Sequence, residues 1–171
     1  MLLFLDTEFT DLPQTDKPAP KLISLALVSE NGKDWFYGEI EQGNGWGFPD
    51  CSNFVMLEVV PLLKGGGFAM SPEDLKARLL AWLGAMPRNL TLACDSCIDV
   101  GFLRALLGQD WPAKLNPKVY DLRPMIDTSG GDRAAIRCHK ERGTNAHNAL
   151  DDAWANRAGW LAWRSSKRSP A

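Results

Sequence analysis

The sequence predicts an α/β fold built on a mixed sheet, and three patterns support this fold class. Residues 2–5 and 22–28 are continuous apolar runs, which suit strands buried on both faces. The dipeptide Asn31-Gly32 follows the second run and favours a hairpin, because both residues tolerate positive φ. Beyond residue 71, helical and strand patterns alternate. This order of elements is typical of an α/β domain.

The N-terminal half begins with a predicted antiparallel meander of three strands, at residues 2–5, 22–28 and 35–37. A helical pattern over residues 53–63 runs as far as Pro61. Ser71 predicts the start of the next helix, because Pro72 suits its first position and Asp74 completes a capping box. The residues on the apolar face of that helix are Leu75, Leu79, Trp82, Leu83 and Met86.

The C-terminal half is predicted to alternate strands with helices. Short strands are expected at residues 90–94 and 118–122, and a helix between them at residues 99–108 makes these two strands parallel. A last helix is expected at residues 149–163. Its apolar stripe consists of Leu150, Trp154, Ala158 and Leu161. The predicted sheet therefore has five strands flanked by helices.

Length and composition indicate a single globular domain. The chain has 171 residues, 45% hydrophobic and 23% charged, which is enough to bury a core without disulfides. We expect the domain to span residues 1–163 and residues 164–171 to form a basic, flexible tail. No apolar run approaches the length of a membrane span, and the first residues lack the features of a signal peptide. A cytoplasmic protein with four reduced cysteines is therefore expected.

The charge distribution is uneven. A formal net charge of −2 argues against a nucleic-acid partner, since such proteins usually carry a basic surface. Residues 130–171 are basic, however, and the rest of the chain is acidic, which suits a metal site facing a polyanion or is simple scatter. Residues 132–142 are interpreted as a mobile loop over backbone phosphates or as a solvated charge run. The cations in this stretch are Arg133, Arg137, Lys140 and Arg142.

Acidic residues interrupt apolar elements at two places. Asp6 and Glu8 follow the first strand, and a spacing of two puts both carboxylates on one face. Such a pair is repulsive and costly to desolvate unless a cation neutralises it, although the strand could simply reach the surface there. Asp99 begins a predicted helix, where an anion is favoured, and it could be a plain cap.

A third polar cluster precedes the last helix. Asn148 is a plausible cap with Asp151 three residues later, and Asp152 lies in the first turn, where the helix dipole favours its ionised form. His147 stands five residues before Asp152, on the loop side. A lone histidine is more often structural, but this position beside a carboxylate also suits a proton acceptor.

Together, the three clusters resemble the exonuclease motifs of the DEDDh superfamily of 3′–5′ exonucleases, which includes the proofreading subunit of DNA polymerase III, ribonuclease T and oligoribonuclease. The matching runs are Asp6-Thr7-Glu8, Asp99 followed by Phe102-Leu103, and His147 with Asp152. The resemblance covers residues 1–163. The run from Asp6 to Phe9 and residues 22–37 and 54–63 also resemble small stand-alone mycobacterial-type exoribonucleases, although those usually have Thr or Met in place of Phe9.

The resemblance implies a ribonuclease H-like fold and two-metal hydrolysis. Two Mg²⁺ or Mn²⁺ ions would be bridged by Asp6. Glu8 and Asp152 would complete the site of the ion that holds the attacking water. Asp99 would act at the second ion, largely through water. His147 would be the general base. Further implied substrate-binding residues are Thr7, Phe9, Ser96, Phe102 and Arg137. The substrate would be a single-stranded RNA or DNA 3′ end, RNA slightly favoured, and relatives suggest a homodimer.

Three alternatives remain open from the residues alone. Cys94 and Cys97 form a C-x-x-C between a strand and a helix, as in thiol redox proteins, but nearby Asp95 and Asp99 disfavour a thiolate. A zinc site could be formed by Cys94, Cys97, Cys138 and His139, although the last two are adjacent and fit one ion poorly. A non-catalytic nucleic-acid binder on the same fold is the third.

Overall fold

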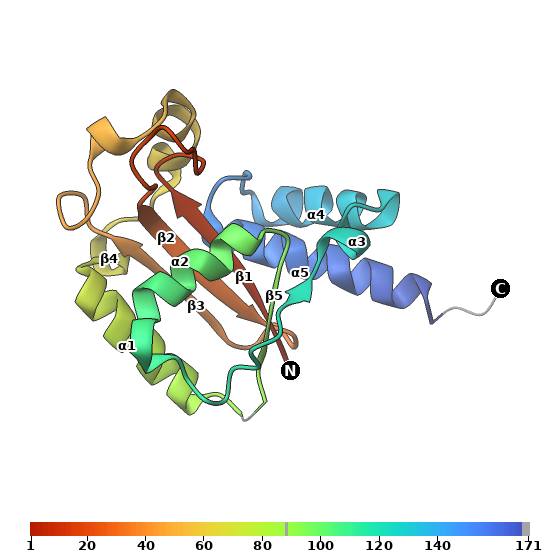
Figure 1. Ribbon diagram of the computed structural model, residues 1–171. Coiled ribbons are helices and arrows are strands. Elements are labelled where there is room, and N and C mark those ends of the chain that lie inside the picture. Colours follow the sequence, from red (N-terminus) through yellow and green to blue (C-terminus); the bar gives the residue numbers. More distant parts are fainter. Residues whose placement is uncertain (88, 169–171) are drawn as a thin grey trace.

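The computed structural model describes residues 1–87 and 89–168 and shows an α/β fold with one mixed sheet (Figure 1). The described strands form the order β4-β3-β2-β1-β5-β6. Their bounds are β1 Leu2–Phe9, β2 Leu22–Ser29, β3 Trp35–Ile40, β4 Ala69–Met70, β5 Thr91–Cys94 and β6 Tyr120–Asp121. The α-helices are α1 Pro72–Ala85, α2 Cys97–Leu107, α3 Arg123–Ile126, α4 Ser129–Arg142 and α5 Ala149–Ser166. Shorter helical turns cover Phe48–Asp50, Val55–Val59, Val60–Leu62, Gly66–Phe68 and Gly108–Asp110.

The predicted strand arrangement is confirmed, with one addition. Strands β1, β2 and β3 form the antiparallel meander, while β5 pairs parallel to β1 and β6 parallel to β5. The additional strand is β4, which pairs parallel to the end of β3 through only two residues, Ala69 and Met70. A strand of two residues has no periodicity to read, so the sequence could not reveal it.

Two apolar cores lie on opposite faces of the sheet. Leu3 and Leu5 of β1 belong to the core covered by α1 and α2, whereas Phe4 belongs to the core covered by α5. All three side chains are fully buried. This is why the first strand reads as a continuous apolar run: successive side chains alternate between two buried faces.

The helix starts follow the predicted caps. Ser71 accepts a hydrogen bond from the Asp74 backbone at the start of α1, and Asn148 accepts one from the Leu150 backbone at the start of α5. Helix α2 begins at Cys97, two residues before the predicted start, because the Ser96 hydroxyl caps it. Helix α5 continues to Ser166, three residues into the segment expected to be a tail. Residues 169–171 lie outside the described residues.

The prediction of a mobile loop at residues 132–142 is wrong. These residues belong to α4, which packs along α5 (Figure 1). The Thr128 hydroxyl caps its start and Gly143, at φ 65°, ends it. A Cβ on Gly131 would lie 2.6 Å from the Ile126 carbonyl oxygen, so only glycine permits this close approach of α4 to α3. Within the described residues, no helix is both long and apolar enough to cross a membrane.

Candidate active site

The fold brings the predicted site residues to one edge of the sheet. Strands β1, β5 and β6 are parallel, so their carboxyl ends meet there, next to the starts of α2 and α5. A cavity of about 690 Å³ opens at this edge. The predicted residues that line it are Asp6, Thr7, Glu8, Phe9, Ser96, Asp99, His147 and Asp152.

Asp6 belongs to two groups of carboxylates in this cavity. One group is Asp6, Glu8 and Asp152, and the other is Asp6, Asp95 and Asp99. In each group one oxygen per residue lies within 4.8 Å of the others. Among the described residues, no other group of histidine, cysteine or carboxylate side chains is close enough to hold a metal ion. The zinc site considered from the cysteines is therefore not formed.

Burial and mutual repulsion make these carboxyl groups reluctant to ionise. The pKa of Asp6 is raised well above its ordinary value by burial and then by the charges of Asp99 and Asp152. Burial raises the pKa of Glu8 to about 8, with the charges of Asp152 and Asp99 adding to it, and burial also raises the pKa of Asp99 to about 7. Burial raises the pKa of Asp152 as well, and four such groups in one cavity are stabilised by bound positive charge.

Asp99 is buried with half of its hydrogen-bonding capacity unused. Its side chain is 3% exposed, and its Oδ1 accepts a hydrogen bond of 2.7 Å from the Thr7 hydroxyl. Its Oδ2 has no hydrogen-bond partner among the described residues. Buried anionic oxygens are normally paired or coordinate a metal, so this atom is available as a ligand for a cation. The donor set consists of carboxylate oxygens, which suit hard ions such as Mg²⁺ and Mn²⁺.

His147 occupies a constrained position at the cavity wall. Its φ is 74°, a left-handed backbone conformation, and its backbone N–H donates to Asp152 Oδ2 at 2.7 Å. The Phe54 ring packs edge-on against the imidazole, with 4.9 Å between centroids. The hydrogen bond to Asp152 fixes the His147 backbone and the Phe54 ring packs against its imidazole, which lines the same cavity as the carboxylates and is chemically able to accept a proton.

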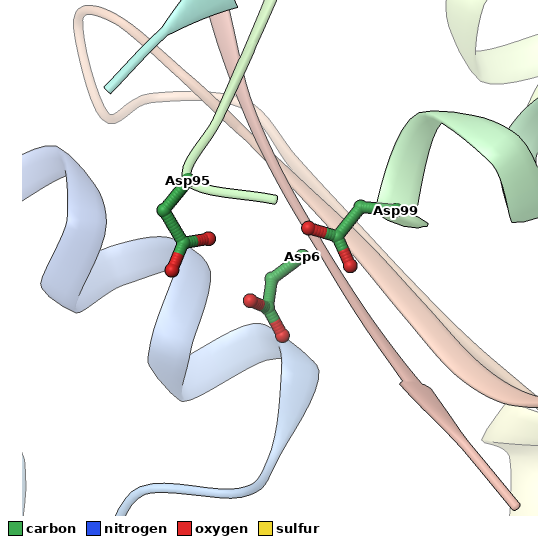
Figure 2. Close-up of side chains that lie close together, drawn as sticks. All are labelled: Asp6, Asp95 and Asp99. Carbon is green, nitrogen blue, oxygen red and sulfur yellow. The ribbon is translucent and has the colours of Figure 1, made fainter. Parts of the chain in front are cut away.

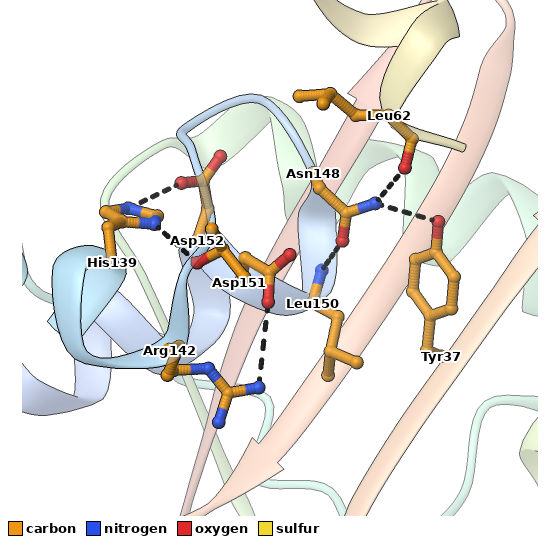
Figure 3. A network of polar contacts seen from close by, with 9 residues as sticks. Tyr37, Leu62, His139, Arg142, Asn148, Leu150, Asp151 and Asp152 are labelled. Carbon is orange, nitrogen blue, oxygen red and sulfur yellow. Dashed lines mark hydrogen bonds and ion pairs between the residues drawn. The ribbon is translucent and has the colours of Figure 1, made fainter. Parts of the chain in front are cut away.

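A second histidine contacts the same aspartate, and the sequence analysis missed this. His139 Nε2 on α4 lies 3.2 Å from Asp152 Oδ1 (Figure 3). The His139 Nδ1 lies 3.3 Å from the Thr144 hydroxyl. Both oxygens of Asp152 are therefore held, one by each histidine. Figure 3 also shows how the Asn148 amide ties the start of α5 to the Tyr37 hydroxyl and the Leu62 carbonyl.

Two predicted substrate-binding residues do not line the cavity. Arg137 is exposed on α4. Phe102 instead stacks on Phe9, with 5.0 Å between ring centroids, so it acts on the cavity only through Phe9. A cation that the sequence analysis overlooked, Arg123, does line the cavity, and its Nε donates to the Asp95 carbonyl at 2.9 Å. The sequence signal that could have revealed Arg123 was its position just after the strand β6, which lies next to β5.

The cysteine pair does not have the properties of a redox site. Cys94 is buried on β5, and burial together with the charges of Asp99 and Asp95 raises the pKa of its thiol to about 12. Redox cysteines need a lowered pKa, because the thiolate is the reactive form. All four cysteines are free thiols.

Comparisons with known proteins match the fold. No family model and no curated protein matches the chain by sequence. Among solved structures, S. pombe Pop2p in its Mg²⁺- and Mn²⁺-bound form is 16% identical, with a TM-score of 0.62 over 98% of this chain and 83% of that one. A 3′-exonuclease described in 3′-end-specific recognition of a histone mRNA stem-loop is 13% identical, with a TM-score of 0.53 over 97% and 81%. The expected ribonuclease H-like α/β fold is thus confirmed, and the part of the chain that the structure describes has six strands instead of the five expected.

Proposed function

We propose that the protein is a metal-dependent 3′–5′ exonuclease that releases nucleoside 5′-monophosphates from single-stranded nucleic acid. The observation that carries the proposal is the pair of carboxylate groups sharing Asp6 in an open cavity that His147 also lines. The two structural neighbours agree with it, since one is a Mg²⁺- and Mn²⁺-bound form of Pop2p and the other is a 3′-exonuclease that recognises the 3′ end of a histone mRNA stem-loop.

The carboxylates fit two divalent ions. Asp6, Glu8 and Asp152 would hold one, and Asp6 with Asp99 would hold the other. Bound there, such ions neutralise the phosphodiester, lower the pKa of water and stabilise the leaving oxygen. The unpaired Asp99 Oδ2 and the raised pKa values of Asp6 and Glu8 are the structural support for this assignment.

The remaining residues position the reactants. His147 takes the proton of the attacking water, and its backbone hydrogen bond to Asp152 fixes the residue at the wall of the cavity that holds the acidic cluster. Thr7 fixes the rotamer of Asp99. Phe9, supported from behind by Phe102, offers an aromatic face on which a base can stack, a contact that is worth about 1–3 kcal/mol.

The substrate is proposed to be RNA in preference to DNA, because the run from Asp6 to Phe9 and residues 22–37 and 54–63 resemble small stand-alone exoribonucleases. A DNA-directed exonuclease at the same site is the second candidate, favoured by the Asp99-x-x-Phe102-Leu103 motif, which is closer to the proofreading type.

The test is an assay on 3′ shortening. Single-stranded RNA and DNA oligomers labelled at the 5′ end are incubated with Mg²⁺ or Mn²⁺, and the products are resolved by length and by chromatography of released mononucleotides. We expect stepwise shortening and 5′-monophosphates with the wild type and none with Asp6→Asn. Asp11→Asn is the matched control, because Asp11 lines the same cavity but lies outside both carboxylate groups. No shortening with either ion, or full activity in Asp6→Asn, would overturn the proposal.

A further inference from the structure

A fifth carboxylate, Asp95, lies at the metal-binding edge and is not among the residues that the DEDDh motifs assign. It follows β5 directly, and β5 pairs with β1 through Phe4 and Ala93. Continuing this register by two residues places Asp95 beside Asp6. The close-up in Figure 2 shows the Asp6, Asp95 and Asp99 carboxylates, from three separate segments, turned toward a common space. Their ligand oxygens lie within 4.8 Å of one another.

The backbone around Asp95 is held firmly. The Arg123 side chain donates to the Asp95 carbonyl at 2.9 Å, and the Leu122 backbone donates to the Cys94 carbonyl at 2.9 Å. On the other side, the Ser96 hydroxyl caps α2 by accepting from Ile98. Asp95 is therefore fixed between a strand end and a helix start, so its carboxylate is brought to the cavity by regular structure rather than by a long loop.

A separate observation points to a cation in this space. Asp99 Oδ2 is buried, has no hydrogen-bond partner among the described residues, and belongs to the side chain that faces Asp6 and Asp95 (Figure 2). The Thr7 hydroxyl uses the other oxygen, so the Asp99 side chain cannot turn away without losing that bond. Three carboxylates this close together, one of which has a buried unpaired oxygen, repel one another unless a positive ion lies between them.

We propose that Asp95 is a direct ligand of a divalent cation held between Asp6, Asp95 and Asp99. The inference rests on the metal-dependent part of the proposed function and extends it, because the resemblance assigns only Asp6 and Asp99 to this ion. Three carboxylates on one Mg²⁺ or Mn²⁺ overcompensate its charge. The ion therefore binds before any nucleic acid arrives, rather than requiring a substrate phosphate to complete its coordination.

The test counts Mn²⁺ ions in the absence of substrate. Free Mn²⁺ is measured by electron paramagnetic resonance while the metal is titrated into wild type, Asp95→Asn and Asp11→Asn. We expect two bound ions per chain in the wild type and in Asp11→Asn, and at least a tenfold weakening of one of them in Asp95→Asn. In chelator, Asp95→Asn should melt no lower than the wild type, since a repulsive charge is gone, whereas its stabilisation by Mn²⁺ should be smaller.

The outcomes separate this inference from the proposed function. Unchanged binding of both ions in Asp95→Asn, or equal weakening in Asp95→Asn and Asp11→Asn, would overturn the role of Asp95. In that case the 3′-shortening assay and Asp6→Asn would still decide on the exonuclease. Absence of Mn²⁺ binding in the wild type would overturn both.

Discussion

The raised pKa of Glu8 predicts that the metal-free protein loses stability as the pH rises. Folded Glu8 keeps its proton up to about pH 8, whereas an unfolded glutamate releases it near its ordinary value of 4.5. Between these two pH values the folded state binds more protons than the unfolded state, so the free energy of unfolding falls with rising pH. This stabilising contribution is complete below about pH 4.5 and is lost above about pH 8.

The magnitude follows from the size of the shift. Each pKa unit corresponds to about 1.4 kcal/mol, so the full shift of Glu8 would correspond to about 5 kcal/mol. Asp152 and Asp99 contribute to this shift through their charges, and they can take up protons in turn. We therefore expect Glu8 itself to account for a loss of about 2–3 kcal/mol between pH 5 and pH 8.5 in the metal-free protein, so that the loss in Glu8→Gln is smaller by this amount.

Urea unfolding in chelator at several pH values measures this directly. Glu58→Gln is the matched control, because Glu58 is exposed and outside both carboxylate groups, and it should follow the wild type. Adding Mn²⁺ at pH 8.5 should restore stability to the wild type more than to Glu8→Gln. The reasoning is refuted if the metal-free wild type is equally or more stable at pH 8.5 than at pH 5, or if Glu8→Gln has the same pH dependence.

Other predictions concern single side chains. His147→Ala should lower kcat for 3′ shortening at least a hundredfold while Mn²⁺ still binds; full activity would remove it as the base. His139→Ala should weaken Mn²⁺ binding severalfold, with partial rescue by His139→Gln, and unchanged binding would show that the Asp152 contact is dispensable. Gly131→Ala should destabilise the protein by about 1–3 kcal/mol in urea unfolding, whereas Gly130→Ala, with open space at its Cβ, should not. Leu79→Ala, at a fully buried site, should cost about 2–5 kcal/mol.

The sequence predicted the elements that have strong periodicity or clear caps. The meander followed from apolar runs and Asn31-Gly32, and the starts of α1 and α5 followed from Ser71 and Asn148. Helix α4 was missed because its first turn reads Ser-Gly-Gly-Asp, which favours a loop, and its mean hydropathy is low. What makes it a helix is tertiary: Gly131 packs against Ile126, and the whole segment packs along α5.

The candidate site was predictable where residue spacing within one element determines position. Asp6 and Glu8 share a strand face, and His147 and Asp152 share the start of α5, so motif spacing alone brought each pair together. Asp95 and His139 depend instead on how separate elements meet. The position of Asp95 beside Asp6 depends on the register between β1 and β5. The contact of His139 with Asp152 depends on the helix α4, which the sequence pattern did not reveal.

The position of Asp6 links the predicted pH dependence of stability to the proposed metal binding. Asp6 lies on β1, where it pairs with Ala26 of β2 just past the last pair between β1 and β5, so its backbone cannot move away from the other carboxylates without breaking the sheet. The repulsion is therefore built into the sheet itself, and protons or metal ions are the means of relieving it. Protons do so at low pH and leave the carboxylates unable to bind an ion; metal does so near neutral pH. The same side chains that we expect to make the metal-free protein less stable at high pH are thus the ones that we propose to bind divalent ions.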